Sequence, residues 1–277
     1  MKTVVLFAAL VALVASFPEQ NRPLEDNGTN RTKPSPRIIG GKTAIPHSIP
    51  YQAHLVITGT TTIWACSGSV ISNHYILTSG RCLEGGVQVE INLGVHDTSE
   101  VGPDQITYIT RDILIHPDYS GNDASYLRND IALLKTEYEI PFNDYIQPIT
   151  LPNRVDLDDA ETFEGHVGRA SGWGLTNGGD DTTDSTVLKY FDAKVIKNTE
   201  CKKSFFPYID TTGICTSGDE GVGVCRGDVG GPLVADYKLI GVSSFWAILC
   251  IPGYPSGYTR VSSYIDWILE NSDVVIA

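Results

Sequence analysis

We expect an all-β fold made of two packed antiparallel β-barrels and ending in one helix. The chain has 277 residues, of which 42% are hydrophobic, which is enough apolar material for one large or two small cores. Its 27 glycines and 15 prolines, with a single methionine, favour short strands joined by frequent turns over long helices. Short runs rich in Val, Ile, Thr and Tyr recur between these turn residues, as a strand-rich fold requires.

The runs form two sets, separated by a polar stretch near residues 146–162. The first set comprises residues 51–58, 69–77, 87–93, 106–114 and 131–136, and the second comprises 167–171, 188–195, 213–216, 233–243 and 257–261. Two β-barrels fit this spacing. The helix is expected to begin at Ser262 or Ser263 as N-cap, with Tyr264, Trp267 and Ile268 on one face.

The N-terminal region has the pattern of a secreted precursor. Residues 1–16 contain one lysine, an apolar run and small residues at the end, which is typical of a cleavable signal peptide and too short to span a bilayer. Residues 17–37 are polar and rich in Pro and Asn, so we expect an exposed leader peptide. Glycosylation acceptors lie in it at Asn27 and Asn30. We therefore predict an extracellular glycoprotein.

Charge and composition exclude several classes of partner. The formal net charge of −13 disfavours binding to nucleic acid and to anionic lipid. We expect no membrane span, because no stretch outside residues 1–16 is apolar enough. No Cys or His cluster has the spacing of a zinc site and no calcium loop is recognisable, so we expect neither metal nor cofactor. The simplest expectation is an acidic, extracellular monomer.

Six cysteines in a secreted chain indicate disulfide bonds, but their spacing alone leaves the pairing open. They are Cys66, Cys82, Cys201, Cys215, Cys225 and Cys250.

Four ordered segments carry a family resemblance. They are RIIGG at residues 37–41, ILTSGRC at 76–82, NDIALL at 129–134 and CRGDVGGPL at 225–233, with SGWG at 171–174 in support. Together they resemble the chymotrypsin-like serine peptidases of the trypsin/chymotrypsin family, and arthropod secreted chymotrypsin- and collagenase-like proteins in particular. The resemblance covers residues 38 to about 270. It implies two six-stranded antiparallel barrels, at about 38–150 and 155–262, and a C-terminal helix at about 262–272.

The resemblance also implies a covalent framework and an activation step. The disulfides would be Cys66–Cys82, Cys201–Cys215 and Cys225–Cys250. Cutting after Arg37, as in a zymogen, would free the α-amino group of Ile38, which in the family folds inward to pair with the aspartate matched here by Asp228. A milder alternative is that Asp228 keeps only a structural role.

At the positions that carry catalysis in the family, the sequence departs from the family pattern. Arg81 stands at the position of the histidine, Val229 at that of the serine, and Asp130 at that of the orienting carboxylate. A guanidinium stays protonated at physiological pH and a valine has no nucleophilic atom, so we expect peptidase activity to be lost. The oxyanion hole implied by the family, formed by the backbone N–H groups of Gly227 and Val229, does not depend on these side chains.

The buried Asp130 carboxylate needs a partner once the histidine is gone. We hypothesise that the guanidinium of Arg81 forms a charge-assisted ion pair with this carboxylate, through either one or two hydrogen bonds. The alternative is an exposed Arg81, with Asp130 satisfied by Ser244 and by backbone N–H groups.

The specificity pocket implied by the family involves Gly223, Trp246 and Ser256. Gly223 at its floor replaces the aspartate that trypsin-type enzymes carry, which indicates a chymotrypsin-, elastase- or collagenase-like ancestor. Trp246 replaces an expected glycine. It either obstructs the pocket or is swung outward by the insertion that leads to Cys250.

Three functions follow from the sequence. The first is an inactive serine-protease homologue, or pseudoprotease, that binds an unknown protein or peptide ligand as a decoy, by capturing inhibitors, or as a cofactor in an extracellular cascade. The second is an active secreted serine endopeptidase of chymotrypsin- or elastase-like specificity. The third is a bulk secreted structural protein. Arg81, Val229 and Trp246 favour the first.

Overall fold

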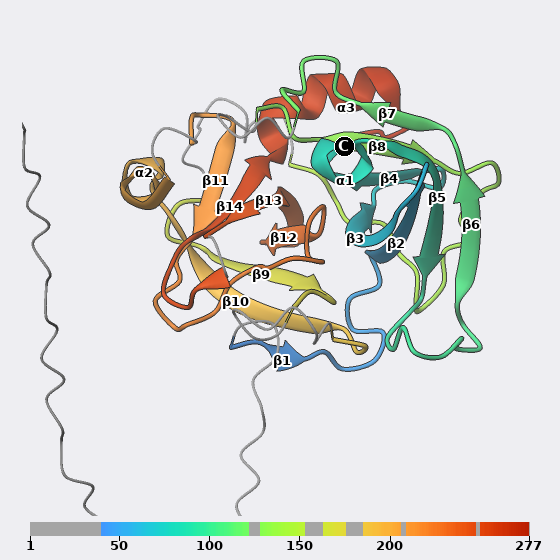
Figure 1. Cartoon of the computed structure of the whole chain (residues 1–277), viewed down its shortest axis with the longest axis horizontal. Coiled ribbons are helices and arrows are strands. Elements are labelled where there is room, and N and C mark those ends of the chain that lie inside the picture. Colours follow the sequence, from blue (N-terminus) through green and yellow to red (C-terminus); the bar gives the residue numbers. More distant parts are fainter. Residues whose placement is uncertain are drawn as a thin grey trace, which may run out of the picture. The chain divides into compact units, whose positions relative to one another are not determined.

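The computed structural model describes residues 40–121, 128–152, 163–175, 185–205, 209–247 and 250–276. The predicted signal peptide, the leader with Asn27 and Asn30, and the junction between Arg37 and Ile38 lie outside these ranges. Within them, the predicted all-β fold is confirmed. The described strands form two antiparallel sheets that lie side by side, and a helix closes the chain (Figure 1).

The first sheet has the strand order β6-β5-β2-β3-β4-β8-β7. Its strands are β2 (Gln52–Gly59), β3 (Ile63–Val70), β4 (Tyr75–Thr78), β5 (Gly86–Leu93), β6 (Ile106–Thr110), β7 (Ile113–Ile115) and β8 (Ala132–Lys135). Only Arg111 and Asp112 separate β6 from β7, so these two are halves of one bent strand that spans both ends of the sheet. The sheet is therefore strongly curled but remains open in its hydrogen bonding, as a half-barrel.

The second sheet closes on itself, because β10 pairs with both β9 and β11. The six strands of the ring are β9 (Val167–Gly172), β10 (Lys189–Ile196), β11 (Gly213–Thr216), β12 (Pro232–Ala235), β13 (Lys238–Trp246) and β14 (Ser256–Arg260). A short strand, β1 (Lys42–Thr43), is added at β10 through Lys42–Tyr190 and Thr43–Lys189 pairing. The range of about 38–150 predicted for the first barrel thus contains β1, which pairs with the second sheet.

Each sheet encloses its own apolar core, and a third cluster joins them. Along β2, Leu55 and Ile57 are fully buried while the residues between them are half-buried, which is the alternation of a strand with one core face. The joining cluster brings Leu77 and Leu133 of the first sheet together with Val242 of the second. The C-terminal helix contributes Ile265 and Ile268 to the same cluster. This packing holds the two sheets against each other. The surface where residues 80–83, the turn at Val229 and the end of β13 meet is called the cleft below.

Local chemistry interrupts two of the predicted strand runs. The run 69–77 contains a turn in which the Ser72 hydroxyl accepts hydrogen bonds from the N–H groups of His74 and Tyr75, so it divides into β3 and β4. The run 233–243 turns at Asp236 and Tyr237, whose φ angles are 49° and 62°. The first turn is stabilised by a polar side chain, and the second contains residues in the left-handed backbone conformation. Strands disfavour both features.

The helices differ most from expectation. A 3-10 turn (Val261–Tyr264) precedes α3 (Ile265–Asn271), so Ser262 and Ser263 lie inside the turn and no side chain caps α3. Helix α2 (Asn198–Phe205) was not predicted, because it buries only Cys201 and Phe205. A further short helix, α1 (Gly80–Leu83), lies between the first sheet and the cleft.

Candidate functional site

Asp130 lies at the base of the cleft, two residues before the start of β8, with 1% of its surface exposed. One carboxylate oxygen accepts a 2.7 Å hydrogen bond from the backbone N–H of Arg81, and the other accepts a 2.5 Å bond from the Ser244 hydroxyl. Burial raises the pKa of Asp130 to about 6, against the lowering effect of these hydrogen bonds. The site therefore holds a carboxylate that is well bonded but costly to ionise.

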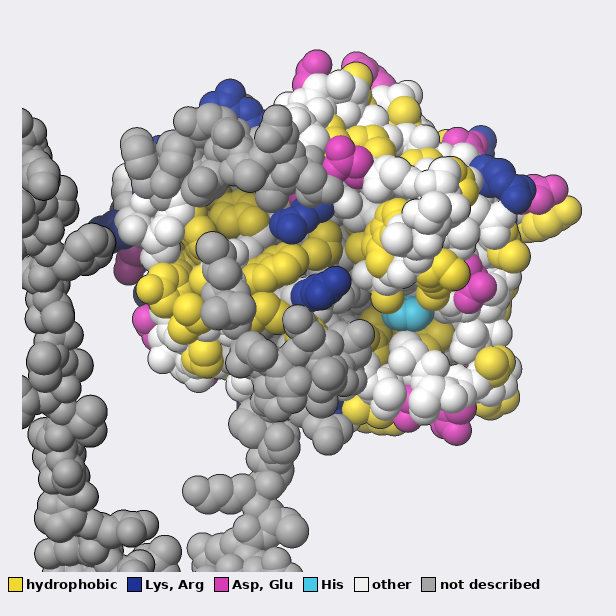
Figure 2. Space-filling model, in the orientation of Figure 1, with side chains coloured by type: hydrophobic (Ala, Val, Ile, Leu, Met, Phe, Trp, Pro, Cys, Tyr) yellow, Lys and Arg dark blue, Asp and Glu magenta, His cyan; other side chains and the backbone are white. Residues whose placement is uncertain are grey.

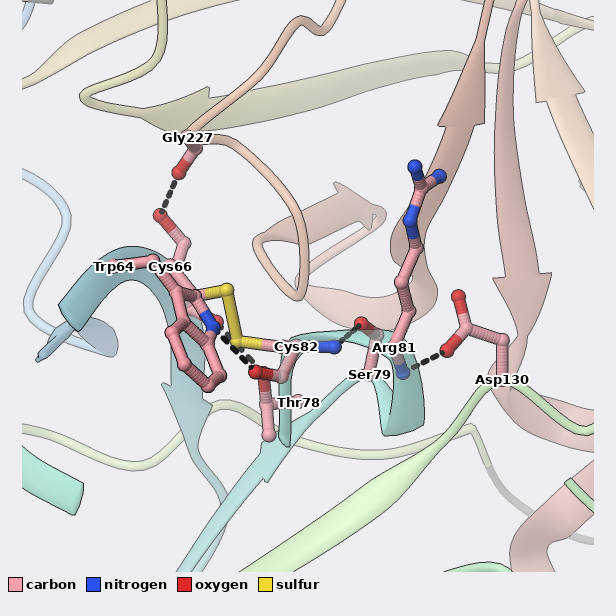
Figure 3. The surroundings of a disulfide bond; sticks show 9 residues. Trp64, Cys66, Thr78, Ser79, Arg81, Cys82, Asp130 and Gly227 are labelled. Carbon is pink, nitrogen blue, oxygen red and sulfur yellow. Dashed lines mark hydrogen bonds between the residues drawn. A yellow bond between two sulfur atoms is a disulfide. The ribbon is translucent and has the colours of Figure 1, made fainter. Parts of the chain in front are cut away.

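The Arg81 side chain turns away from this carboxylate. Arg81 lies in α1, whose first turn is capped by the Ser79 hydroxyl. Figure 3 shows its backbone nitrogen facing Asp130, while the side chain carries the guanidinium away from the carboxylate. Nη1 donates a 3.3 Å hydrogen bond to the Ser244 carbonyl. The guanidinium also lies over the Trp246 ring, 5.1 Å from its centroid.

The hypothesis of a guanidinium–carboxylate pair between Arg81 and Asp130 is therefore wrong. Both Asp130 oxygens already accept hydrogen bonds from Arg81 backbone and Ser244, as the alternative expected. The alternative was itself incomplete, because Arg81 is half-buried and not exposed to solvent. The aromatic face of Trp246 takes the place of the expected anion.

Val229 lies in a tight turn on the other side of the cleft. Its carbonyl accepts a 2.8 Å hydrogen bond from the Ser67 N–H, and its side chain packs into the core cluster of the first sheet. The neighbouring Asp228 accepts hydrogen bonds from the backbone N–H groups of Gly174, at 2.8 Å, and Cys225, at 2.9 Å. Gly227 has a φ angle of 94°, a conformation that strongly favours glycine.

Two backbone donors of this turn point to no partner. Within the described residues, the backbone N–H groups of Gly227 and Val229 donate no hydrogen bond. The N–H groups of the other residues in this turn, Asp228, Gly230 and Gly231, each donate one. These are the two N–H groups for which the sequence predicts an oxyanion hole. An arrangement of this kind can bind an anion or an electron-rich oxygen.

Gly223, Trp246 and Ser256 line one cavity, as the sequence predicts for the specificity pocket. The cavity has a volume of only about 10 Å³, no more than a single water molecule needs. Trp246 is half-buried and packs against the apolar clusters of both sheets. Of the two predictions for Trp246, obstruction of the pocket or an outward side chain, the structure favours obstruction.

Three disulfides hold the segments around the cleft. They are Cys66–Cys82, Cys201–Cys215 and Cys225–Cys250, the pairs that the resemblance implies. The first places α1 against β3, and the third ties the turn at Val229 to the wall of the pocket. Disulfides of this kind are typical of extracellular proteins.

Sequence reasoning missed the contact between Arg81 and Trp246, and also the bond from Ser67 to Val229. These residues come from different sheets, and no local pattern relates them. Among the described residues, no group of three His, Cys, Asp or Glu side chains could hold a metal ion. No described helix is long and apolar enough to cross a membrane.

Comparison with known proteins gives one consistent set of relatives. The sequence profile of the family described as Trypsin matches residues 38–268. The chymotrypsin of Phaedon cochleariae is 35% identical over 99% of both chains, and the collagenase of Hypoderma lineatum is 35% identical over 99% of this chain and 100% of its own. A solved structure described as HL collagenase superposes with a TM-score of 0.77, at 35% identity, over 86% of this chain and 100% of the other. These matches span both sheets and the cleft between them.

Proposed function

Because this chain belongs to the trypsin family and has its chymotrypsin-like fold, we propose that it is a secreted, non-catalytic family member that acts by binding a protein or peptide in the former substrate cleft. The observation that carries the proposal is the identity of Arg81 and Val229 on the two sides of that cleft. The relatives' names, chymotrypsin and collagenase, favour the second candidate, an active endopeptidase.

Peptide hydrolysis on this scaffold needs a hydroxyl nucleophile, a neutral imidazole to accept its proton, and a carboxylate to orient the imidazole. We assign Arg81 to the imidazole position because its backbone N–H is hydrogen-bonded to the buried Asp130. We assign Val229 to the nucleophile position because it follows Asp228 in the turn that carries the unpaired N–H groups. The guanidinium cannot accept a proton, and the valine side chain cannot attack a carbonyl.

No histidine of the chain replaces the missing base. All six histidines lie within the described residues, and none of them forms a hydrogen bond with Asp130. The His116 ring lies edge-on to Tyr264 and tilted against Trp267, while His54 is packed edge-on against Trp173. A rescue of catalysis would require both a new base and a new nucleophile at Val229.

The blocked pocket supports the same proposal. Substrate selection in a family peptidase depends on inserting a side chain into the specificity pocket, but here Trp246 and the pocket walls leave about 10 Å³. Binding without side-chain insertion is therefore the function that this geometry supports best.

The test is a hydrolysis assay on the secreted protein, before and after cleavage at the junction that follows Arg37. We expect no turnover of chymotrypsin- or elastase-type peptide substrates and no labelling by a serine-directed probe, in either form. The matched control is the variant with Arg81→His and Val229→Ser, prepared in the same way. Hydrolysis by the unmodified chain at a rate comparable to family enzymes would overturn the proposal in favour of the endopeptidase.

Secretion and processing are tested separately. N-terminal sequencing of protein recovered from the medium should show loss of residues 1–16, and a second species beginning at Ile38 would reveal cleavage of the leader. Retention of residues 1–16 on protein that stays inside the cell would contradict the extracellular assignment.

A further inference from the structure

The Arg81 guanidinium is a half-buried cation that forms no direct ion pair among the described residues, since Asp130 attracts it only at longer range. It carries five N–H donors, of which one is used, in the 3.3 Å bond to the Ser244 carbonyl. No carboxylate among the described residues forms an ion pair with it, because Asp130 accepts its hydrogen bonds from other groups. A cation held partly out of water in this way is poised to bind an anion.

The unpaired N–H groups of Gly227 and Val229 provide a second set of donors. The turn that holds them is rigid, because Asp228 is bonded to Gly174 and Cys225, while the Val229 carbonyl is bonded to Ser67. Peptide N–H groups fixed in one orientation bind an oxyanion without further reorganisation.

Hydrogen bonds place the two sets of donors at neighbouring residues of β13. The residue after Val229 donates its N–H to the Ser243 carbonyl, and the next carbonyl along β13, that of Ser244, accepts the bond from Arg81. Val229 also packs into the apolar cluster that Trp246 contacts, and Trp246 lies beneath the guanidinium. Figure 2 shows Lys or Arg side chains set in a largely hydrophobic surface near the middle of the face that it draws.

We propose that this cleft binds the C-terminal carboxylate of a peptide whose last residue is small, with Arg81 and the N–H groups of Gly227 and Val229 as its donors. This rests on the proposed non-catalytic function, since the same groups in a peptidase would serve the reaction. The carboxylate has two oxygens, so one meets the guanidinium and the other meets the backbone donors. The methyl groups of Val229 lie beside it and cannot react.

The closed pocket defines the terminal residue. With Trp246 in place, a cavity of about 10 Å³ takes no side chain larger than a methyl group, so Gly or Ala fits at the chain end and Phe does not.

The experiment measures fluorescence anisotropy of labelled peptides on the full secreted chain. The probes are an Ala-terminated peptide with a free carboxylate, its C-terminal amide, the Phe-terminated acid, and an amidated peptide with Glu at its last position. We expect the free Ala acid to bind at least about tenfold more tightly than its amide and than the Phe acid. Equal affinity for acid and amide, or no binding at millimolar peptide, overturns the proposal, and tighter binding of the Glu amide assigns the site to acidic side chains instead.

Variants of the chain test the donor. Arg81→Gln should remove the preference for the acid, Arg81→Lys should keep part of it, and Arg111→Gln is the matched control. Arg111 is exposed and, among the described residues, its side chain bonds to Gln88 of the first sheet, so its loss should leave the preference unchanged. A preference that persists in folded Arg81→Gln overturns the proposal. Mass spectrometry of the peptides separates the two hypotheses, because cleavage products contradict the non-catalytic function, whereas intact peptides without acid preference contradict only the carboxylate site.

Discussion

The guanidinium carbon of Arg81 lies 5.1 Å from the centroid of the Trp246 ring, which joins α1 to the end of β13 across the cleft. A cation over an aromatic face contributes about 0.5–2 kcal/mol, depending on how far water is excluded. The contact holds the Trp246 ring, which lines the pocket together with Gly223. Arg81 and Trp246, which both depart from the family pattern, thus stabilise each other's position.

Trp246→Ala should open the pocket and destabilise the protein. The indole packs against apolar clusters of both sheets, so we expect its removal to lower the free energy of unfolding by about 2 kcal/mol, measured by urea denaturation. Tyr138→Ala is the control, because this aromatic side chain is 67% exposed and its loss should change stability by less than about 0.5 kcal/mol. Equal effects of the two substitutions would show that Trp246 is not a packing residue.

Restoring the base and nucleophile should restore some hydrolysis. In Arg81→His with Val229→Ser, the new imidazole would lie beside the bonded Asp130 and the new hydroxyl beside the unpaired N–H groups. We expect turnover of small peptide esters above the background of the unmodified chain, with a further gain of about tenfold when Trp246→Gly is added. Val229→Ser alone is the control and should stay at background, since it lacks a base. Full activity of that single variant would refute the assignment of Arg81.

Asp130→Asn should change how stability depends on pH. The pKa of Asp130 is about 6 in the folded chain against 3.8 without its surroundings, so the folded state binds the extra proton between these values and stability falls as pH rises through them. An asparagine keeps an acceptor for Arg81 and a group that can bond to Ser244, without the buried charge. We expect the variant to be about 2 kcal/mol more stable near pH 8, with the advantage vanishing below about pH 4. Thermal unfolding across this range measures it, and a loss of stability near pH 8 would mean that the charged bonds outweigh the burial.

Gly230→Ala should disrupt the junction of the sheets. The φ angle of Gly230 is 80°, and a Cβ there would overlap the Ser67 carbonyl and the Thr78 hydroxyl. Gly85 has nearly the same φ, 78°, but a Cβ there meets nothing within 4 Å, so Gly85→Ala isolates the backbone strain of about 1 kcal/mol. We expect Gly230→Ala to cost about 3 kcal/mol more than that in urea denaturation. Similar costs for the two variants would show that close packing at Gly230 is unimportant.

Much of the fold could be predicted from sequence because it depends on local pattern. Strands β2 and β5 follow from alternating or continuous apolar runs bounded by turn residues, and their predicted limits differ from the observed ones by one residue. Helix α2 could not be predicted in this way, since its buried side is only Cys201 and Phe205, and its stability comes from a disulfide and from tertiary packing. The crossover of β1 to the second sheet left no signal in a two-residue strand.

The sequence by itself determined which chemical groups are present: an arginine and a valine where the family resemblance places a base and a nucleophile, a glycine at the pocket floor, and a tryptophan beside it. Identity of side chains is fixed by covalent structure and needs no fold. Only the tertiary structure decided where the Arg81 guanidinium goes, because Asp130 is already satisfied by a backbone N–H and a hydroxyl, and a long cationic side chain then takes the nearest carbonyl and aromatic face. Those partners come from β13, which chain folding alone brings to α1.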